Sequence, residues 1–141
     1  GTMALSAPVS VLVCHPADAG AALADHAARA IHVAGCDSLW QRLAAREGLA
    51  PARIGQALAA DSSLVALEMV AAGLGAALVA DDLAAPARAA GRVAAPAPAR
   101  ATGQAHHVAL TRCGAERAEA RVFRDWLVAA MGVVPGVRPS A

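Results

Sequence analysis

Lysine and tyrosine are missing from this sequence, and the other aromatic residues are rare. All 12 basic residues are arginine, and the aromatic residues are one phenylalanine and two tryptophans. The core therefore has to be built largely from alanine, valine and leucine, which bury little area each, so we expect modest stability. The net charge is only +1 and the arginines are scattered. Because phosphate binding needs a concentrated basic patch, this pattern argues against a nucleic-acid surface in the chain.

Paired cysteines and long apolar runs are missing as well. Cys14, Cys36 and Cys113 are odd in number and have no Cys-x-x-Cys spacing, so neither a disulfide framework nor a zinc site is indicated. We expect a reduced, cytoplasmic protein without metal or cofactor. No run reaches the ~18 to 20 apolar residues that cross a membrane, and the first residues lack the layout of a signal peptide. Gly1 and Thr2 are interpreted as the remnant of a tag, with residues 1–7 as a leader.

What the sequence does contain is one clear helix and strand. Leu64, Leu67 and Val70 recur at helical spacing, polar residues precede them, and Gly73 can take the left-handed conformation that ends a helix. Residues 75–79 are continuously apolar, as is typical of a strand covered on both faces. With 141 residues, one domain is expected.

Similar patterns place the other elements. We expect strands at residues 9–14, 30–34, 53–60, 91–95 and 106–111, with residues 96–103 as a loop. We expect helices at about residues 18–28, from Asp37 or Ser38 to Gly48, and at about 115–131. A further short helix should begin at Asp81, and Pro86 should shorten or kink that helix. Strands and helices alternate through the first half. Right-handed crossovers would then make the sheet parallel and the fold class α/β.

The stretch from Ser63 to Val79 also carries a family resemblance. Together with Gly91, Arg92 and Val93, and with the run Val122-Phe-Arg-Asp-Trp-Leu127, it resembles the effector-binding domain of LysR-type transcriptional regulators. Upstream, residues 31–33 followed by Trp40 are similar to the equivalent segment of some branches of this family. The resemblance covers roughly residues 8 to 131.

The resemblance implies a type II periplasmic-binding-protein-like fold, here mainly one lobe with a largely parallel sheet flanked by helices. Residues 8–104 would form the second lobe of the effector-binding domain, 105–131 the returning strand and helix of the first lobe, and 132–141 a flexible tail. The implied function is to bind a small, anionic metabolite and to control transcription through an N-terminal DNA-binding domain that this chain does not contain. Because the first-lobe contacts would be missing, we expect weak effector binding by this chain alone.

Five residues are candidates for ligand contact. Asp61, Ser62 and Ser63 lie where a strand end meets a helix amino terminus, whose partial positive charge favours an anion. Cys36 and Ser38 lie at the neighbouring turn and would be beside them in a parallel sheet. The other interpretation, that these residues only cap their helices, remains open. In the family a cleft-facing Ser or Thr lies at the turn formed here by Asp61, Ser62 and Ser63.

No catalytic residues stand out, and a binding module is favoured over an enzyme. Cys14 and His15 are adjacent, a poor geometry for a nucleophile and its base, and Gly73 and Gly75 follow a helix, the reverse of a dinucleotide-binding loop. An alternative is the substrate-binding lobe of a solute-binding protein or of a dehydratase of the same fold. The stripe Val122, Phe123, Trp126 and Leu127 has no partner expected within the lobe, so we predict that it is buried against a second copy or folds back on the lobe.

Overall fold

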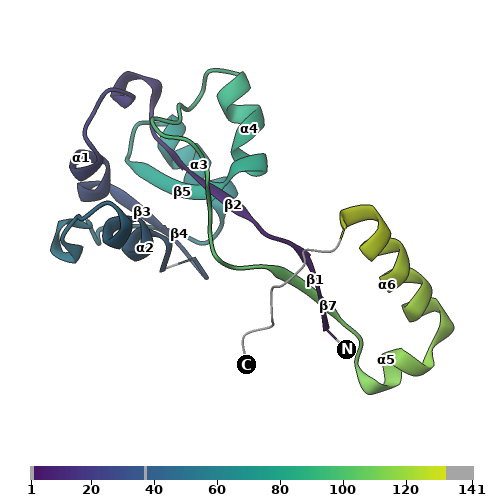
Figure 1. Cartoon of the computed structure of the whole chain (residues 1–141). Helices are drawn as coiled ribbons and strands as arrows, with labels where there is room; N and C mark the ends of the chain where they lie inside the picture. The colour runs from purple at the N-terminus through teal and green to yellow at the C-terminus, as the bar shows by residue number, and fades with distance from the viewer. Residues whose placement is uncertain (1, 37, 133–141) are drawn as a thin grey trace. The chain divides into compact units, whose positions relative to one another are not determined.

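The computed structural model describes residues 2–36 and 38–132, and it divides into two compact units (Figure 1). Unit 2 is the continuous segment from Val9 to Arg100. Unit 1 combines the residues before Val9 with those that follow Arg100. Each unit is described separately below.

Unit 2 is built around a five-stranded sheet in the order β4-β3-β5-β2-β6. Its strands are β2 (Val9–Val13), β3 (Ala30–Val33), β4 (Leu58–Ala60), β5 (Ala76–Ala80) and β6 (Arg100–Ala101). β3 runs parallel to both β4 and β5, whereas β2 runs antiparallel to β5. The parallel strands therefore all have their carboxyl ends at one edge of the sheet, which is the edge meant below, and β2 starts at that edge.

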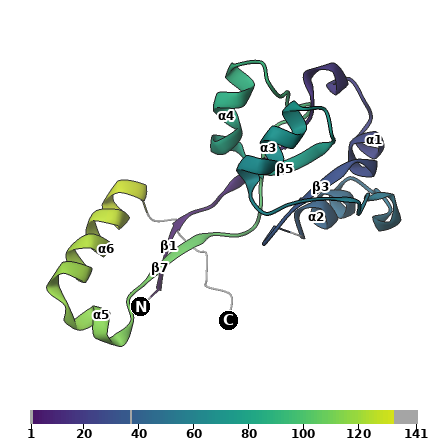
Figure 2. The ribbon, with the colours of Figure 1, turned by 180° about the vertical axis from the view of Figure 1, so that it is seen from behind.

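Helices cover both faces of this sheet, and a separate apolar cluster lies under each helix pair (Figure 2). The helices are α1 (Leu23–Ala28), α2 (Ser38–Arg46), α3 (Ser63–Ala71) and α4 (Asp81–Ala89). One cluster joins α3 and α4 to Val11, Val13 and Ile31, and the other joins α1 and α2 to Leu12 and Leu78. Since side chains alternate along a strand, the apolar runs of β2 and β5 supply both clusters.

Trp40 is the largest side chain in the α2 cluster. It is 3% exposed, and its Nε1 donates a hydrogen bond of 3.2 Å to the backbone oxygen of Ile31. The residue after Ile31, His32, is half-buried, and its Nε2 lies 2.7 Å from the backbone oxygen of Gly55. The only aromatic side chain buried among the described residues is thus anchored by its polar atom, and His32 has a structural partner.

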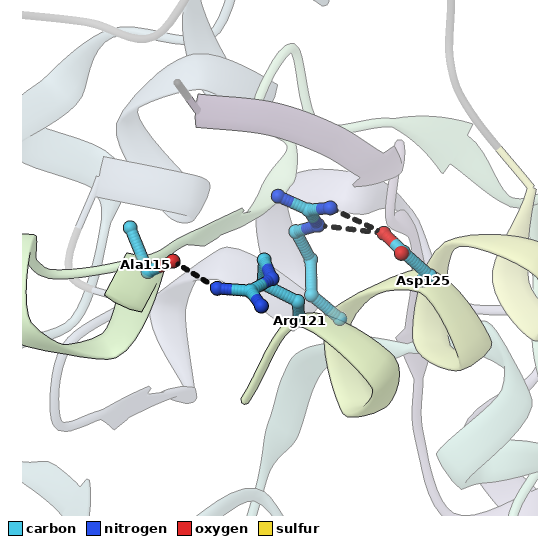
Figure 3. Close-up of polar contacts among 4 residues, drawn as sticks. Ala115, Arg121 and Asp125 are labelled. Carbon is cyan, nitrogen blue, oxygen red and sulfur yellow. Dashed lines mark hydrogen bonds and ion pairs between the residues drawn. The ribbon is translucent and has the colours of Figure 1, made fainter. Parts of the chain in front are cut away.

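Unit 1 contains a two-stranded sheet and two helices. β1 (Thr2–Ser6) pairs antiparallel with β7 (His106–Ala109). α5 (Arg112–Glu116) is capped by Thr111, whose Oγ1 accepts a hydrogen bond of 3.0 Å from the Gly114 amide, and α6 (Ala118–Met131) follows. Arg121 Nη1 donates to the backbone oxygen of Ala115 over 2.7 Å, which ties α6 to α5 (Figure 3).

The α/β fold class is confirmed, together with most elements expected from the sequence. The strands near residues 9–14, 30–34, 75–79 and 106–111 are observed, as are α2 and α3. Gly73 follows α3 with a φ of +80°, in the left-handed region that was expected to end this helix. No helix among the described residues combines the length and the apolar character needed to cross a membrane.

Several expectations about individual elements were wrong. The strand expected at 53–60 is only β4, and Arg53 belongs to a 3-10 turn, Pro51–Arg53. The helix expected at 18–28 is only α1. α4 continues through Pro86, and the helix expected at 115–131 is divided between α5 and α6 at Arg117.

The sheet edge and the amino terminus also differ from expectation. Residues 91–95 form only an isolated bridge between Ala94 and Cys14, and the edge strand is β6, within the segment expected to be a loop. Thr2, excluded as a tag remnant, begins β1. The first strand of unit 2 is antiparallel to its neighbour, so the sheet is mixed. The predictions for Asp37 and for residues 133–141 of the tail lie outside the described residues.

Candidate functional site

The carboxyl ends of β3 and β4 lie side by side. The two strands pair in parallel with Val33 opposite Ala60, and the Ala34 amide donates a hydrogen bond of 3.0 Å to the backbone oxygen of Ala60. The chain then turns into α2 through Cys36 and into α3 through Asp61 and Ser62. Both turns that carry the candidate residues therefore leave the same edge of one sheet.

The amino terminus of α3 is capped by Ser62. Its backbone is extended, and its Oγ accepts a hydrogen bond of 3.3 Å from the Val65 amide. The Ala66 amide is also bonded, to the backbone oxygen of Ser62 at 3.0 Å. The amides of Ser63 and Leu64 precede the first helical hydrogen bond and have no partner among the described residues. These two amides, with the partial positive charge of the helix end, form a small donor site.

Around this donor site the side chains differ in exposure. Ser63 is half-buried, and its hydroxyl has no hydrogen-bond partner among residues 2–36 and 38–132. Asp61 is exposed and brings a carboxylate next to the same helix end. A ligand at this position would thus meet two amides, two hydroxyls and a nearby negative charge.

The neighbouring turn offers less. Cys36 is half-buried and packs against the apolar cluster under α3 and α4, as expected of a structural thiol. Ser38 is exposed and is the first residue of α2. The structure places these two residues at the correct edge, and the packing of Cys36 favours the interpretation in which it supports the fold.

A third turn, between β5 and α4, also leaves this edge. Asp82 Oδ1 accepts a hydrogen bond of 2.8 Å from the Leu83 amide, and Asp81 Oδ1 lies 2.9 Å from Arg88 Nη2. Sequence reasoning used these residues only to start a helix. The predicted parallel sheet already implies that β5 ends at this edge, whereas the position of this turn next to the end of β3 depends on the strand order, for which the sequence carried no signal.

Groups capable of covalent or metal chemistry are poorly placed. Burial, and secondarily the charge of Asp18, raises the pKa of the Cys14 thiol, which disfavours the nucleophilic thiolate. The His15 Nδ1 accepts a hydrogen bond of 3.1 Å from the Ala17 amide. Within the part of the chain that the structure describes, no three His, Cys, Asp or Glu side chains gather closely enough to hold a metal ion.

Comparisons with known proteins give one consistent result. Residues 7–132 match the family model described as the LysR substrate binding domain. A search of curated protein sequences found no match.

Three solved structures illustrate the likeness. The effector domain of the transcriptional regulator AmpR of Pseudomonas aeruginosa is 24% identical with a TM-score of 0.75, over 92% of this chain and 64% of that one. The CcmR regulatory domain of Synechocystis in complex with 2-PG is 14% identical with a TM-score of 0.62, over 94% and 67%. Full-length LysG from Corynebacterium glutamicum with bound effector Arg is 21% identical with a TM-score of 0.61, over 99% and 48%. The chain thus spans less than two thirds of the AmpR effector domain, and the likeness to these structures concerns the fold.

Proposed function

This chain belongs to the LysR substrate-binding-domain family, and from that premise we propose that it senses a small metabolite for a transcriptional regulator. Control of transcription would act through a DNA-binding part outside residues 1–141, in the cytoplasm, and without a catalytic step. The periplasmic-binding-protein-like fold of this family is the one that the sequence suggested. Two matched structures contain small molecules, 2-PG in one and the effector Arg in the other.

The amino terminus of α3 is the observation that carries this proposal. The unpaired amides of Ser63 and Leu64 and the hydroxyls of Ser62 and Ser63 suit the oxygens of a carboxylate or phosphate group. Ser62 can cap the helix through its oxygen and still donate its hydroxyl proton to a ligand. Capping and ligand contact are therefore compatible at this residue.

Asp61 refines the expected ligand. Its exposed carboxylate would repel a molecule that is anionic throughout, but it would attract an ammonium or a hydroxyl placed next to the ligand's anionic group. We propose a small metabolite with one anionic group at the α3 amides and a donor group near Asp61. Cys36 and Ser38 would contact it only from the side, across the adjacent strand end.

Amide chemical shifts during a ligand titration test this proposal. Arginine and 2-PG are added separately to the isotope-labelled chain. We expect the largest shifts at the Ser63 and Leu64 amides with arginine, which carries an ammonium next to its carboxylate, at millimolar affinity. Ser63→Ala should weaken the shifts because it removes one hydroxyl, whereas Arg53→Gln, at an exposed residue of the same unit, should leave them unchanged. Shifts that avoid residues 61–65 with both compounds would contradict the proposed site, and tight binding to this chain alone would contradict the expected weak affinity.

Unit 1 supports a second part of the proposal, that the chain forms a homo-oligomer. The side chains of Val122, Phe123 and Trp126 are 68%, 60% and 60% exposed, and Leu127 is half-buried. The Phe123 and Trp126 rings lie 5.6 Å apart and form a continuous apolar surface on α6. We propose that a second copy of the chain covers this stripe, since soluble proteins rarely leave a contiguous aromatic patch in water.

A further inference from the structure

A cavity in unit 2 lies away from the α3 amides. It is on the face of the sheet covered by α1 and α2, and its volume is about 220 Å³. This is below the usual range of pockets for drug-sized ligands, roughly 300–1,000 Å³, so only a compact molecule fits. Its apolar wall is formed by Leu12, Leu23, Leu43, Leu78, Pro96 and Pro98.

The floor of this cavity is buried and apolar. Leu12 on β2 and Leu78 on β5 are 6% and 7% exposed, and both belong to the apolar cluster under α1 and α2. Leu23 and Leu43 pack against the same cluster and are only partly buried. The cavity is therefore a part of the core surface that the helices leave open, and an apolar ligand body would gain by covering it.

Charge at the cavity is unbalanced. Arg46 and Glu47 lie there as a pair, with Arg46 Nε 3.6 Å from Glu47 Oε1. Arg100 also lines the cavity, and it has no ion pair within residues 2–36 and 38–132. The hydroxyl of Ser10 lies in the same lining. The net positive charge and the hydroxyl favour a ligand with one anionic group.

A buried polar atom marks the wall of the cavity. His26 on α1 is 5% exposed and lines the cavity, and its Nε2 has no hydrogen-bond partner among the described residues. The Nε2 atom itself has less than 1 Å² of accessible surface, so a ligand in the cavity would pair with it only after the imidazole ring turns toward the cavity. The cavity thus has two separate polar features, Arg100 with Ser10 and the His26 imidazole.

We propose that this cavity is a second binding site, for a compact carboxylate with an apolar body and a hydroxyl at the opposite end. The carboxylate would pair with Arg100 and Ser10, the body would cover Leu12 and Leu78, and the hydroxyl would meet His26 once its imidazole ring has turned toward the cavity. Ser10 and Arg100 are each within one residue of a point where the chain leaves unit 2. A ligand held by both residues would therefore restrain both connecting segments, which gives the site a route to regulation.

Calorimetry on the whole chain with para-hydroxybenzoate tests the site, with para-hydroxybenzamide as the uncharged match and benzoate as the match without a hydroxyl. Para-hydroxybenzoate should bind about tenfold or more tightly than its amide, the range of one charge-assisted hydrogen bond. Arg100→Gln should reduce its affinity to that of the amide, and Arg53→Gln, an exposed arginine elsewhere in unit 2, should have no effect. Benzoate should bind more weakly than para-hydroxybenzoate.

A second variant separates the cavity from other sites. Ala97 is exposed and lines the cavity, so Ala97→Trp should fill it and abolish binding without lowering the melting temperature. Ser63→Ala should leave the binding of para-hydroxybenzoate unchanged, which distinguishes this site from the one at α3. The proposal is overturned if para-hydroxybenzoate does not bind at millimolar concentration, if its amide or benzoate binds equally well, or if binding survives Ala97→Trp.

Discussion

Gly75, like Gly55, is a glycine at which one added methyl group would meet a backbone oxygen. A Cβ at this position would lie 2.2 Å from the backbone oxygen of Arg29, and that oxygen accepts the hydrogen bond from the Ala76 amide at 3.1 Å. The backbone cannot move away without disturbing the start of β5. We expect Gly75→Ala to lower the free energy of unfolding by about 1–3 kcal/mol or more, measured by urea denaturation.

Gly20→Ala is the matched control for this substitution. No atom lies within 4 Å of a Cβ built at Gly20. Its free energy of unfolding should stay equal or rise slightly, because alanine restricts the unfolded chain. Equal stability of the two variants would show that a Cβ at position 75 does not clash with the backbone oxygen of Arg29.

Single residues also define how far the sequence could predict the site. Ser62 and Gly73 were expected to begin and end a helix, because capping depends on residues close in the sequence, and both do. Ligand contact by Ser63 depends on a molecule that the sequence does not describe, so it stays a prediction. The exposure of Asp61 and the core packing of Cys36 required the structure.

At the scale of elements, one ion pair joins α3 to the segment that follows α4. Arg92 Nη2 lies 2.6 Å from Glu68 Oε2, and both side chains are largely exposed. The hydrogen bond from Arg92, followed by its charge, lowers the pKa of the Glu68 carboxyl. A depressed pKa means that the pair stabilises the fold above the unfolded pKa of the carboxyl and is lost as the pH falls through the folded pKa.

Arg92→Gln should therefore raise the pKa of Glu68 to its ordinary value, measured by the chemical shift of the labelled carboxyl against pH. The acid side of the stability curve should change little, because exposed pairs contribute little. Arg88→Gln, which removes the partner of Asp81, is the control and should leave the Glu68 titration unchanged. An unchanged Glu68 pKa in Arg92→Gln would mean that the pair does not persist in solution.

Elements were predicted well where their signals were local. Apolar runs and caps located β2, β3, β5 and α3, whereas β4 is shorter than expected, since only Leu58–Ala60 pair with β3. β6 has only two residues and exists through its pairing with a distant strand, so no periodicity could reveal it. The antiparallel direction of β2 was missed for the same reason, since it depends on strand order.

At the scale of the whole molecule, the stripe on α6 predicts association. Light scattering coupled to gel filtration should show a dimer or larger oligomer, and Phe123→Glu should shift it to the monomer by placing a charge in the apolar contact. Leu64→Glu is the control, because Leu64 is 63% exposed on α3 and lies outside the stripe. A monomeric chain whose Trp126 fluoresces as fully solvent-exposed would contradict the prediction.

The discontinuity of unit 1 has a consequence for the nascent chain on the ribosome. All of unit 2 lies between Val9 and Arg100, so it can fold as soon as that stretch has emerged. β1 is made first, but its partners at His106 to Ala109 are translated about a hundred residues later. At ~5–20 residues per second this delay lasts several seconds. Throughout this delay β1 lacks its partner strand, so its backbone amides and carbonyls can form their hydrogen bonds only with water or with another segment.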